Sequence, residues 1–309
     1  MWTKFLKKLL IFATLLLLGI KIFPQQDSSF YKNRQTALAI ALPTAYVGSM
    51  TALYFAWYKD YPQSNFHFFN DNKEWQGMDK AGHMLATYTL ANYSYKIYQW
   101  SGISKNRSLF LSFVTGFGFQ TVVEVLDGFS AEWGASWGDL LANTAGAALF
   151  ATQQYFWNEQ KILLQYSYSD TPESQYRPNL LGSNLASRML KNYNGISIWA
   201  SFNIASLLPA KNSFPQYLDL ALGYGASGMT GAESNPVEVN GIEIPHFERS
   251  KSFYLSPNIR LSKIPFKNYK VKKYFEILDI LKTPMPAISY NTENKFEFYY
   301  LIGGLGLKF

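Results

Sequence analysis

The chain of 309 residues contains no cysteine and only three histidines. A chain without thiols forms no disulfide framework, presents no thiolate nucleophile and builds no cysteine-ligated zinc site. Charged residues are also scarce, at 16% of the sequence, whereas aromatic residues make up 17%. Few charges combined with many aromatic side chains favour an envelope or membrane-associated protein over a cytosolic enzyme.

The formal net charge of +7 comes largely from two groups of lysines. They are Lys4, Lys7, Lys8 and Lys21 in the first group and Lys263, Lys267, Lys270, Lys272 and Lys273 in the second. The sequence between them is not broadly basic, so we do not expect the protein to bind nucleic acid.

Residues 1–26 have the organisation of a signal peptide. Lysines precede an apolar run at residues 9–18, which is short for a membrane-spanning helix. We therefore predict export with cleavage near Gln25 or Gln26, and an uncleaved anchor is the alternative. The predicted location is the periplasm or the outer membrane, with the inner membrane as the alternative.

Four apolar segments predict helices, at residues 35–58, 78–100, 105–126 and 136–157. The first has no charged residue and is long enough to span a bilayer, although its small residues equally suit close packing. Pro43 is expected to kink or restart it. Asp127-Gly128 predicts a left-handed stop after the third. Short links between four apolar helices predict a four-helix bundle, either in lipid or in water.

The second half of the chain has a different pattern. Short alternating aromatic segments predict antiparallel strands, at residues 162–169, 196–205, 217–226, 253–262 and 296–309. Residues 268–282 predict one basic amphipathic helix. The last segment, ending in Phe309, resembles the C-terminal strand of outer-membrane β proteins, with an ordinary edge strand as the alternative. Five or six strands are too few for a closed barrel, so we expect a sheet or partial barrel.

These patterns together predict an α+β fold. We divide the chain into a signal peptide or anchor at residues 1–26, a helical domain at residues 27–158 and a β region at residues 159–309.

Six polar side chains stand in the helical segments where apolar residues are expected: Asp79, His83, Glu124, Asp127, Asp139 and Asn143. Burying charge is costly unless the groups pair or bind something. Asp79 and His83 are four residues apart and therefore share one helical face. We expect the six side chains to converge in one buried site.

Structural interpretations compete with this one. Asp79 is also suited to cap its helix, Ser136 and Asp139 match a capping box, and Asp127 fits a turn. A lone buried histidine is more often a hydrogen-bonded core residue than a ligand. Glu124 is the hardest to explain by stability, because an acid near a helix C-terminus opposes the macrodipole.

Such a site is rich in oxygen and has one imidazole. It favours Mg, Mn or Ca over a three-histidine zinc centre, although the cofactor stays unspecified. Lys80 joins Asp79, Asp127, Asp139 and Asn143 as a candidate ligand-binding residue. If chemistry occurs, Glu124 and His83 are the candidate general base and acid. No HExxH, P-loop or G-x-S-x-G fingerprint accompanies them, so whether the protein is an enzyme is left open.

Three motifs carry a family resemblance: F-H-F-F-N-D-N-K-E-W-Q-G-M-D-K-A-G-H, E-V-L-D-G-F-S and S-W-G-D-L-L-A-N-T-A-G. Over residues 35–155 the chain resembles the uncharacterised YfiM-like bacterial proteins, described as predicted periplasmic lipoproteins. More distantly, D-K-x-x-H followed by an acid and D-x-x-x-N-x-x-G is similar to the VanZ-like membrane proteins linked to glycopeptide resistance. The resemblance implies an envelope location and a shared site. The lipobox cysteine is missing here, so lipid anchoring is not implied.

We therefore expect a cell-envelope protein that binds a ligand or metal, with membrane or envelope lipid as its partner. A hydrolase or transferase acting on envelope lipid or cell-wall material through Glu124 and His83 is the first alternative. A purely structural envelope scaffold is the second.

Overall fold

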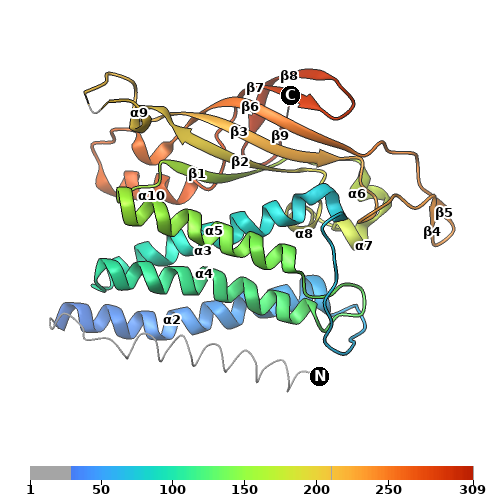
Figure 1. Cartoon of the computed structure of the whole chain (residues 1–309), viewed down its shortest axis with the longest axis horizontal. Helices are drawn as coiled ribbons and strands as arrows, with labels where there is room; N and C mark the ends of the chain where they lie inside the picture. Colours follow the sequence, from blue (N-terminus) through green and yellow to red (C-terminus); the bar gives the residue numbers. More distant parts are fainter. Residues whose placement is uncertain (1–28, 210, 309) are drawn as a thin grey trace. The chain divides into compact units, whose positions relative to one another are not determined.

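The computed structural model describes residues 29–209 and 211–308. The predicted signal peptide, residues 1–26, and Phe309 lie outside the described residues. The chain divides into two compact units. Of the described residues, 29–70 and 86–155 form the helical unit, and 71–85 with 156–308 form the sheet unit. Helices together with an antiparallel sheet confirm the predicted α+β fold (Figure 1).

The described residues before the sheet form four long helices: α2 (Ser29–Leu53), α3 (Met78–Trp100), α4 (Lys105–Asp127) and α5 (Trp137–Trp157). Helix α2 passes through Pro43 without ending and continues into the π-helix η1 (Tyr54–Tyr58). The helical pattern in the sequence therefore located all four helices closely. Helix α3 is continuous from its first turns, which belong to the sheet unit, into the helical unit.

Helices α3 and α5 run side by side in the same direction (Figure 1). The Thr87 hydroxyl donates to Asn143 Oδ1 over 3.1 Å, and further along both helices the rings of Tyr95 and Phe150 are 5.7 Å apart. Helix α4 also approaches α3 closely, because a Cβ on Gly116 would lie 2.7 Å from the Thr87 carbonyl oxygen. Within the helical unit, α3 therefore packs against both α4 and α5.

The end of α4 differs from the expectation. Gly128 is right-handed, with φ −57° and ψ −16°, so the predicted left-handed stop is wrong. A Cβ at Gly128 would lie only 2.4 Å from the ring of Phe66. Close packing of this ring, rather than backbone conformation, accounts for the glycine.

Among residues 29–209 and 211–308, two helices are long and apolar enough to cross a membrane, Tyr31–Tyr58 and Lys105–Asp127. Only 22% and 28% of their most apolar windows are buried. Most residues of each window are therefore half-buried or exposed rather than fully buried.

The sheet unit contains seven antiparallel strands, in the order β1 (Ile162–Tyr168), β2 (Ile196–Asn203), β3 (Leu218–Ser227), β6 (Ser250–Ile259), β7 (Met285–Asn291), β8 (Phe296–Gly303) and β9 (Leu307–Lys308). A separate two-stranded ribbon pairs β4 (Glu238–Val239) with β5 (Ile242–Glu243). Short helices connect the strands: α6 (Glu173–Tyr176), α7 (Pro178–Leu181), α8 (Leu185–Lys191) and α9 (Ile204–Leu207). The predicted amphipathic helix is α10 (Tyr269–Leu278), which follows the 3-10 turn η3 (Leu261–Lys263).

The single strand predicted over residues 296–309 is wrong. The chain reverses through Gly303, Gly304 and Gly306, whose φ angles of 144°, 58° and 95° favour glycine. Strand β9 then pairs back on β8. Strand β1 makes isolated bridges with Leu281 and Leu305, but the ladder is not closed.

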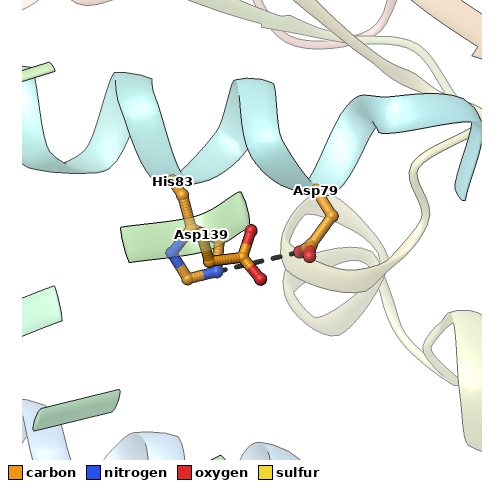
Figure 2. Close-up of side chains that lie close together, drawn as sticks. All are labelled: Asp79, His83 and Asp139. Carbon is orange, nitrogen blue, oxygen red and sulfur yellow. Dashed lines mark ion pairs between the residues drawn. The ribbon is translucent and has the colours of Figure 1, made fainter. Parts of the chain in front are cut away.

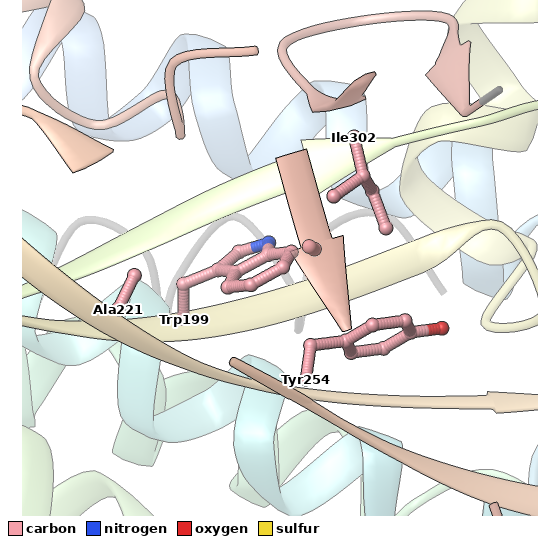
Figure 3. Packing of buried hydrophobic residues seen from close by; sticks show 5 residues of the cluster. Trp199, Ala221, Tyr254 and Ile302 are labelled. Atoms are coloured by element: carbon pink, nitrogen blue, oxygen red, sulfur yellow. The ribbon is translucent and has the colours of Figure 1, made fainter. Parts of the chain in front are cut away.

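The sheet has a small apolar core around one tryptophan (Figure 3). Trp199 is fully buried and packs with Ala221, Tyr254, Ala287 and Ile302. On the neighbouring strand, a Cβ at Gly223 would lie 2.6 Å from the Trp199 ring. The small residues of β3 therefore make room for the indole.

Candidate metal centre

The first two turns of α3 carry Asp79 and His83 on one face. The Nε2 atom of His83 lies 3.8 Å from Asp79 Oδ1 (Figure 2). This separation is too long for a hydrogen bond between them. The two side chains therefore face the same space without a hydrogen bond between these two atoms.

Asp139, in the first turn of α5, completes a close group. One ligand atom each from Asp79, His83 and Asp139 lies within 4.8 Å of the others. The parallel packing of α3 and α5 explains this, because His83 and Asp139 each stand one turn before the bonded pair Thr87 and Asn143. Because His83 and Asp139 each lie four residues before a member of this bonded pair, the same helix packing places them close to each other.

A strained turn precedes α3. Trp75 (φ 49°, ψ 27°) and Gln76 (φ 56°, ψ 23°) are left-handed, followed by Gly77 at φ 80°. Each non-glycine residue in this region costs about 1–3 kcal/mol, and such residues cluster at functional sites. The Trp75 N–H donates to the Ala232 carbonyl over 2.9 Å, and the Tyr224 hydroxyl donates to the Gln76 carbonyl. These contacts fix the point where α3 begins.

Side chains around Asp79 hold its carboxylate. The Tyr193 hydroxyl donates to Oδ1 over 2.7 Å, and Lys80 Nζ lies 3.3 Å from Oδ2. Lys80 makes a shorter pair with Asp71, at 2.6 Å. Burial, and then the charges of Asp71 and Asp79, raise the pKa of nearby Glu74 to about 6. The start of α3 is thus a region of concentrated negative charge.

The capping box predicted at α5 is shared between two acids. The Asp139 N–H donates to Ser136 Oγ over 3.2 Å, which is one half of that motif. The Ser136 N–H donates to Glu124 Oε2 over 3.0 Å, so Glu124 occupies the second half. Glu124 is in the last turn of α4. Its carboxylate nevertheless lies at the N-terminus of α5, where the macrodipole favours an anion.

The remaining predicted residues have partners of their own. Asp127 Oδ1 accepts from the Tyr58 hydroxyl over 2.7 Å and from Trp133 Nε1 over 2.6 Å. Asn143 accepts from Thr87. Of the six polar side chains, Asp79, His83 and Asp139 thus form the close group, while a joint action of Glu124 with His83 stays a prediction.

Sequence reasoning missed the residues that support the group. Tyr193 is separated from Asp79 by 114 positions, and no local pattern connects them. A tyrosine in K-N-Y-N-G has no periodicity or motif that would mark it as a partner. The stretch K-E-W-Q-G also gave no signal for its left-handed residues before glycine.

Residues 66–155 match a family described as "predicted periplasmic lipoprotein (DUF2279)". This match covers all three residues of the group. It confirms the prediction of an exported protein of the cell envelope, in the periplasm or at the outer membrane. The narrower resemblances to YfiM-like and VanZ-like proteins stay predictions. Comparison with curated proteins and with solved structures gives no match.

Proposed function

We propose that the protein is an exported envelope protein that binds a divalent cation through Asp79, His83 and Asp139. The distances within the group support this proposal. Ligand atoms about 2.1 Å from one ion are at most about 4.2 Å apart, and His83 Nε2 is 3.8 Å from Asp79 Oδ1. Since the whole group lies within 4.8 Å, a small side-chain rotation brings all three atoms to one ion.

The ligand types narrow the choice of ion. Ca²⁺ and Mg²⁺ prefer oxygen alone, whereas an imidazole beside two carboxylates suits Mn²⁺ or Zn²⁺. We assign Lys80, Asp127 and Asn143 positioning roles. Lys80 contacts Asp79, Asn143 accepts from Thr87 on α3, and Asp127 accepts from Tyr58 and Trp133. Tyr193 orients Asp79 in the way that outer hydrogen bonds orient metal ligands.

Metal content of the purified full chain tests the proposal. After loading with Mn²⁺ or Zn²⁺ and desalting, we expect one ion per chain by elemental analysis. His83→Ala and Asp139→Asn should lose it. His246→Ala is the matched control, because His246 is an exposed loop histidine. Unchanged stoichiometry in His83→Ala, or no retained ion in the unmodified chain, contradicts the proposal.

A second candidate function is hydrolysis of envelope lipid or cell-wall material. The three protein ligands support it, because they leave positions open for a water whose pKa the ion lowers. Glu124 is the candidate general base, and in this candidate His83 is a ligand rather than the general acid. The metal-loaded chain should hydrolyse a chromogenic ester or phosphodiester, and Glu124→Gln should stop turnover while keeping the ion. An inactive unmodified chain, or an active Glu124→Gln variant, counts against this candidate.

A further inference from the structure

One face of the sheet carries two continuous rows of large apolar side chains. Cross-strand neighbours share a face, and the register aligns one row along Leu222, Leu255, Ile288 and Phe298 and a second along Tyr224, Phe253, Tyr290 and Phe296. We call these eight residues the outer face. Phe298 is 57% exposed and Leu255 46%. Strands β3, β6, β7 and β8 therefore present contiguous apolar surface.

The opposite face of the same strands is buried and combines the small apolar core around Trp199 with polar side chains such as Asp219, Ser256 and Asn258. Arg260 and Asp219 form an ion pair of 2.7 Å, and Asn203 Nδ2 donates to Asp219 over 2.7 Å. Lys282 is fully buried. Its Nζ donates to the carbonyls of Pro257 and Thr283 over 2.9 and 2.8 Å. The buried face and the residues next to it thus hold charged and polar side chains around a small apolar core, whereas the outer face carries large apolar side chains.

This polarity is the inverse of a sheet that faces water. In water, the apolar side chains would occupy the buried face and the charges the exposed one. A sheet facing lipid has the reverse pattern, apolar outward and polar inward. The dimensions also fit, because β3 and β6 have 10 residues each and a tilted strand crosses a bilayer core in about 9–11. The residues of β1 and β2 are mostly buried, so the exposed apolar surface is one-sided.

Helix α10 carries the second feature. Tyr274, Ile277 and Leu278 share one helical face and are exposed, at 70%, 55% and 43%. Lys270, Lys272 and Lys273 on the same helix are also exposed. Exposed apolar residues beside lysines are typical of a helix that lies at the headgroup level of an anionic membrane. Helix α10 shortly precedes β7, which contributes to the outer face.

We propose that the outer face lies against the acyl chains of a lipid bilayer, with α10 at the headgroups. This inference uses none of the proposed ligands, although Tyr224 at one end of the outer face also donates to the Gln76 carbonyl in the turn before α3. Two observations select lipid as the occupant: the inverted polarity of four neighbouring strands and the basic charge of α10. The envelope location also favours lipid, as do the apolar helices α2 and α4, which are long enough to cross a membrane.

The absence of cysteine from the sequence allows a direct test. Leu255→Cys and Phe298→Cys each create a unique thiol for a nitroxide label on the outer face. Val237→Cys is the matched control, because Val237 is an apolar residue 77% exposed outside this face. The labelled full-length chain is reconstituted in vesicles of phosphatidylethanolamine and phosphatidylglycerol. Collision rates are then measured with oxygen, which concentrates in hydrocarbon, and with a water-soluble nickel complex.

We expect labels at residues 255 and 298 to collide more with oxygen than with nickel, and the label at residue 237 to show the reverse ratio. Nickel-dominated collisions at residues 255 and 298 place the face in water and overturn the proposal. If neither reagent reaches the labels, protein covers the face instead. Spin–spin broadening then identifies a second copy, and its absence identifies the same chain. Unchanged circular dichroism of each labelled variant establishes that it is folded.

Discussion

The helical unit and the sheet unit accommodate buried polar groups in different ways. In the helical unit, Glu124 accepts a backbone N–H at the beginning of α5, where the macrodipole stabilises an acid. In the sheet unit, Arg260 pairs with Asp219 and Lys282 donates to carbonyls. Buried charged side chains of the sheet therefore pair or hydrogen-bond within the sheet, whereas Asp79 and Asp139, at the starts of two helices, form a close group with His83.

This difference separates polar groups that stabilise the fold from those that we propose to bind a metal. A buried ion pair with all its hydrogen bonds leaves nothing for a ligand. The acids at the start of α3 and α5 instead share a space with His83. We therefore expect mutations in the sheet to act on stability and mutations at the helix ends to act on metal binding.

The largest effect is expected for Asp219→Ala. This change leaves Arg260 buried without its partner, which should lower the free energy of unfolding by about 3–5 kcal/mol. Urea denaturation measures the loss. Asp170→Ala is the control, since it breaks the more exposed pair with Arg188 and should cost much less, because solvent screens an exposed ion pair. Equal losses in the two variants contradict a self-neutralised sheet.

The next effect concerns metal binding at the helix ends. At a Mn²⁺ concentration of 100 times the dissociation constant, binding should raise the free energy of unfolding by about 2.7 kcal/mol. Thermal melts with and without Mn²⁺ should show this for the unmodified chain and for His246→Ala. If His83→Ala gains as much stability as they do, the proposed ligand set is wrong.

Lys282 gives a pH-dependent prediction for the sheet unit. Burial lowers the pKa of Lys282 to about 7, so between pH 7 and 10.5 the unfolded chain binds this proton more strongly. Stability from this group should therefore rise with pH, by up to about 3 kcal/mol from pH 7 to 9. Urea melts across this range measure it, and Lys282→Met should flatten the curve. An equally steep curve in the variant argues that Lys282 does not cause the rise.

The smallest effect is expected at Glu74. Its pKa is raised to about 6, first by burial and then by Asp71 and Asp79. Its contribution to stability is therefore present below pH 4.5 and lost as pH rises through 6. Because Glu74 is partly exposed, Glu74→Gln should stabilise the chain at pH 7 by only about 1 kcal/mol. A less stable Glu74→Gln variant at pH 7 contradicts the acidic crowding inferred there.

The sequence predicted the four helices because long apolar segments alternate with charged or glycine-containing links. It also placed Asp79 and His83 on one face, since four-residue spacing is a local property of a helix. It did not predict β7, where Pro286 interrupts the strand pattern, or the reversal at Gly303. It could not predict that Glu124 caps α5 or that Tyr193 holds Asp79, because tertiary packing decides both contacts.

The most direct test of the proposed metal site is a crystal structure of the Mn²⁺-loaded full chain with data collected at the manganese absorption edge. We predict one anomalous peak at about 2.0–2.2 Å from Asp79, His83 Nε2 and Asp139. A peak elsewhere on the chain, or direct hydrogen bonds joining these three side chains with no ion among them, would contradict the assignment.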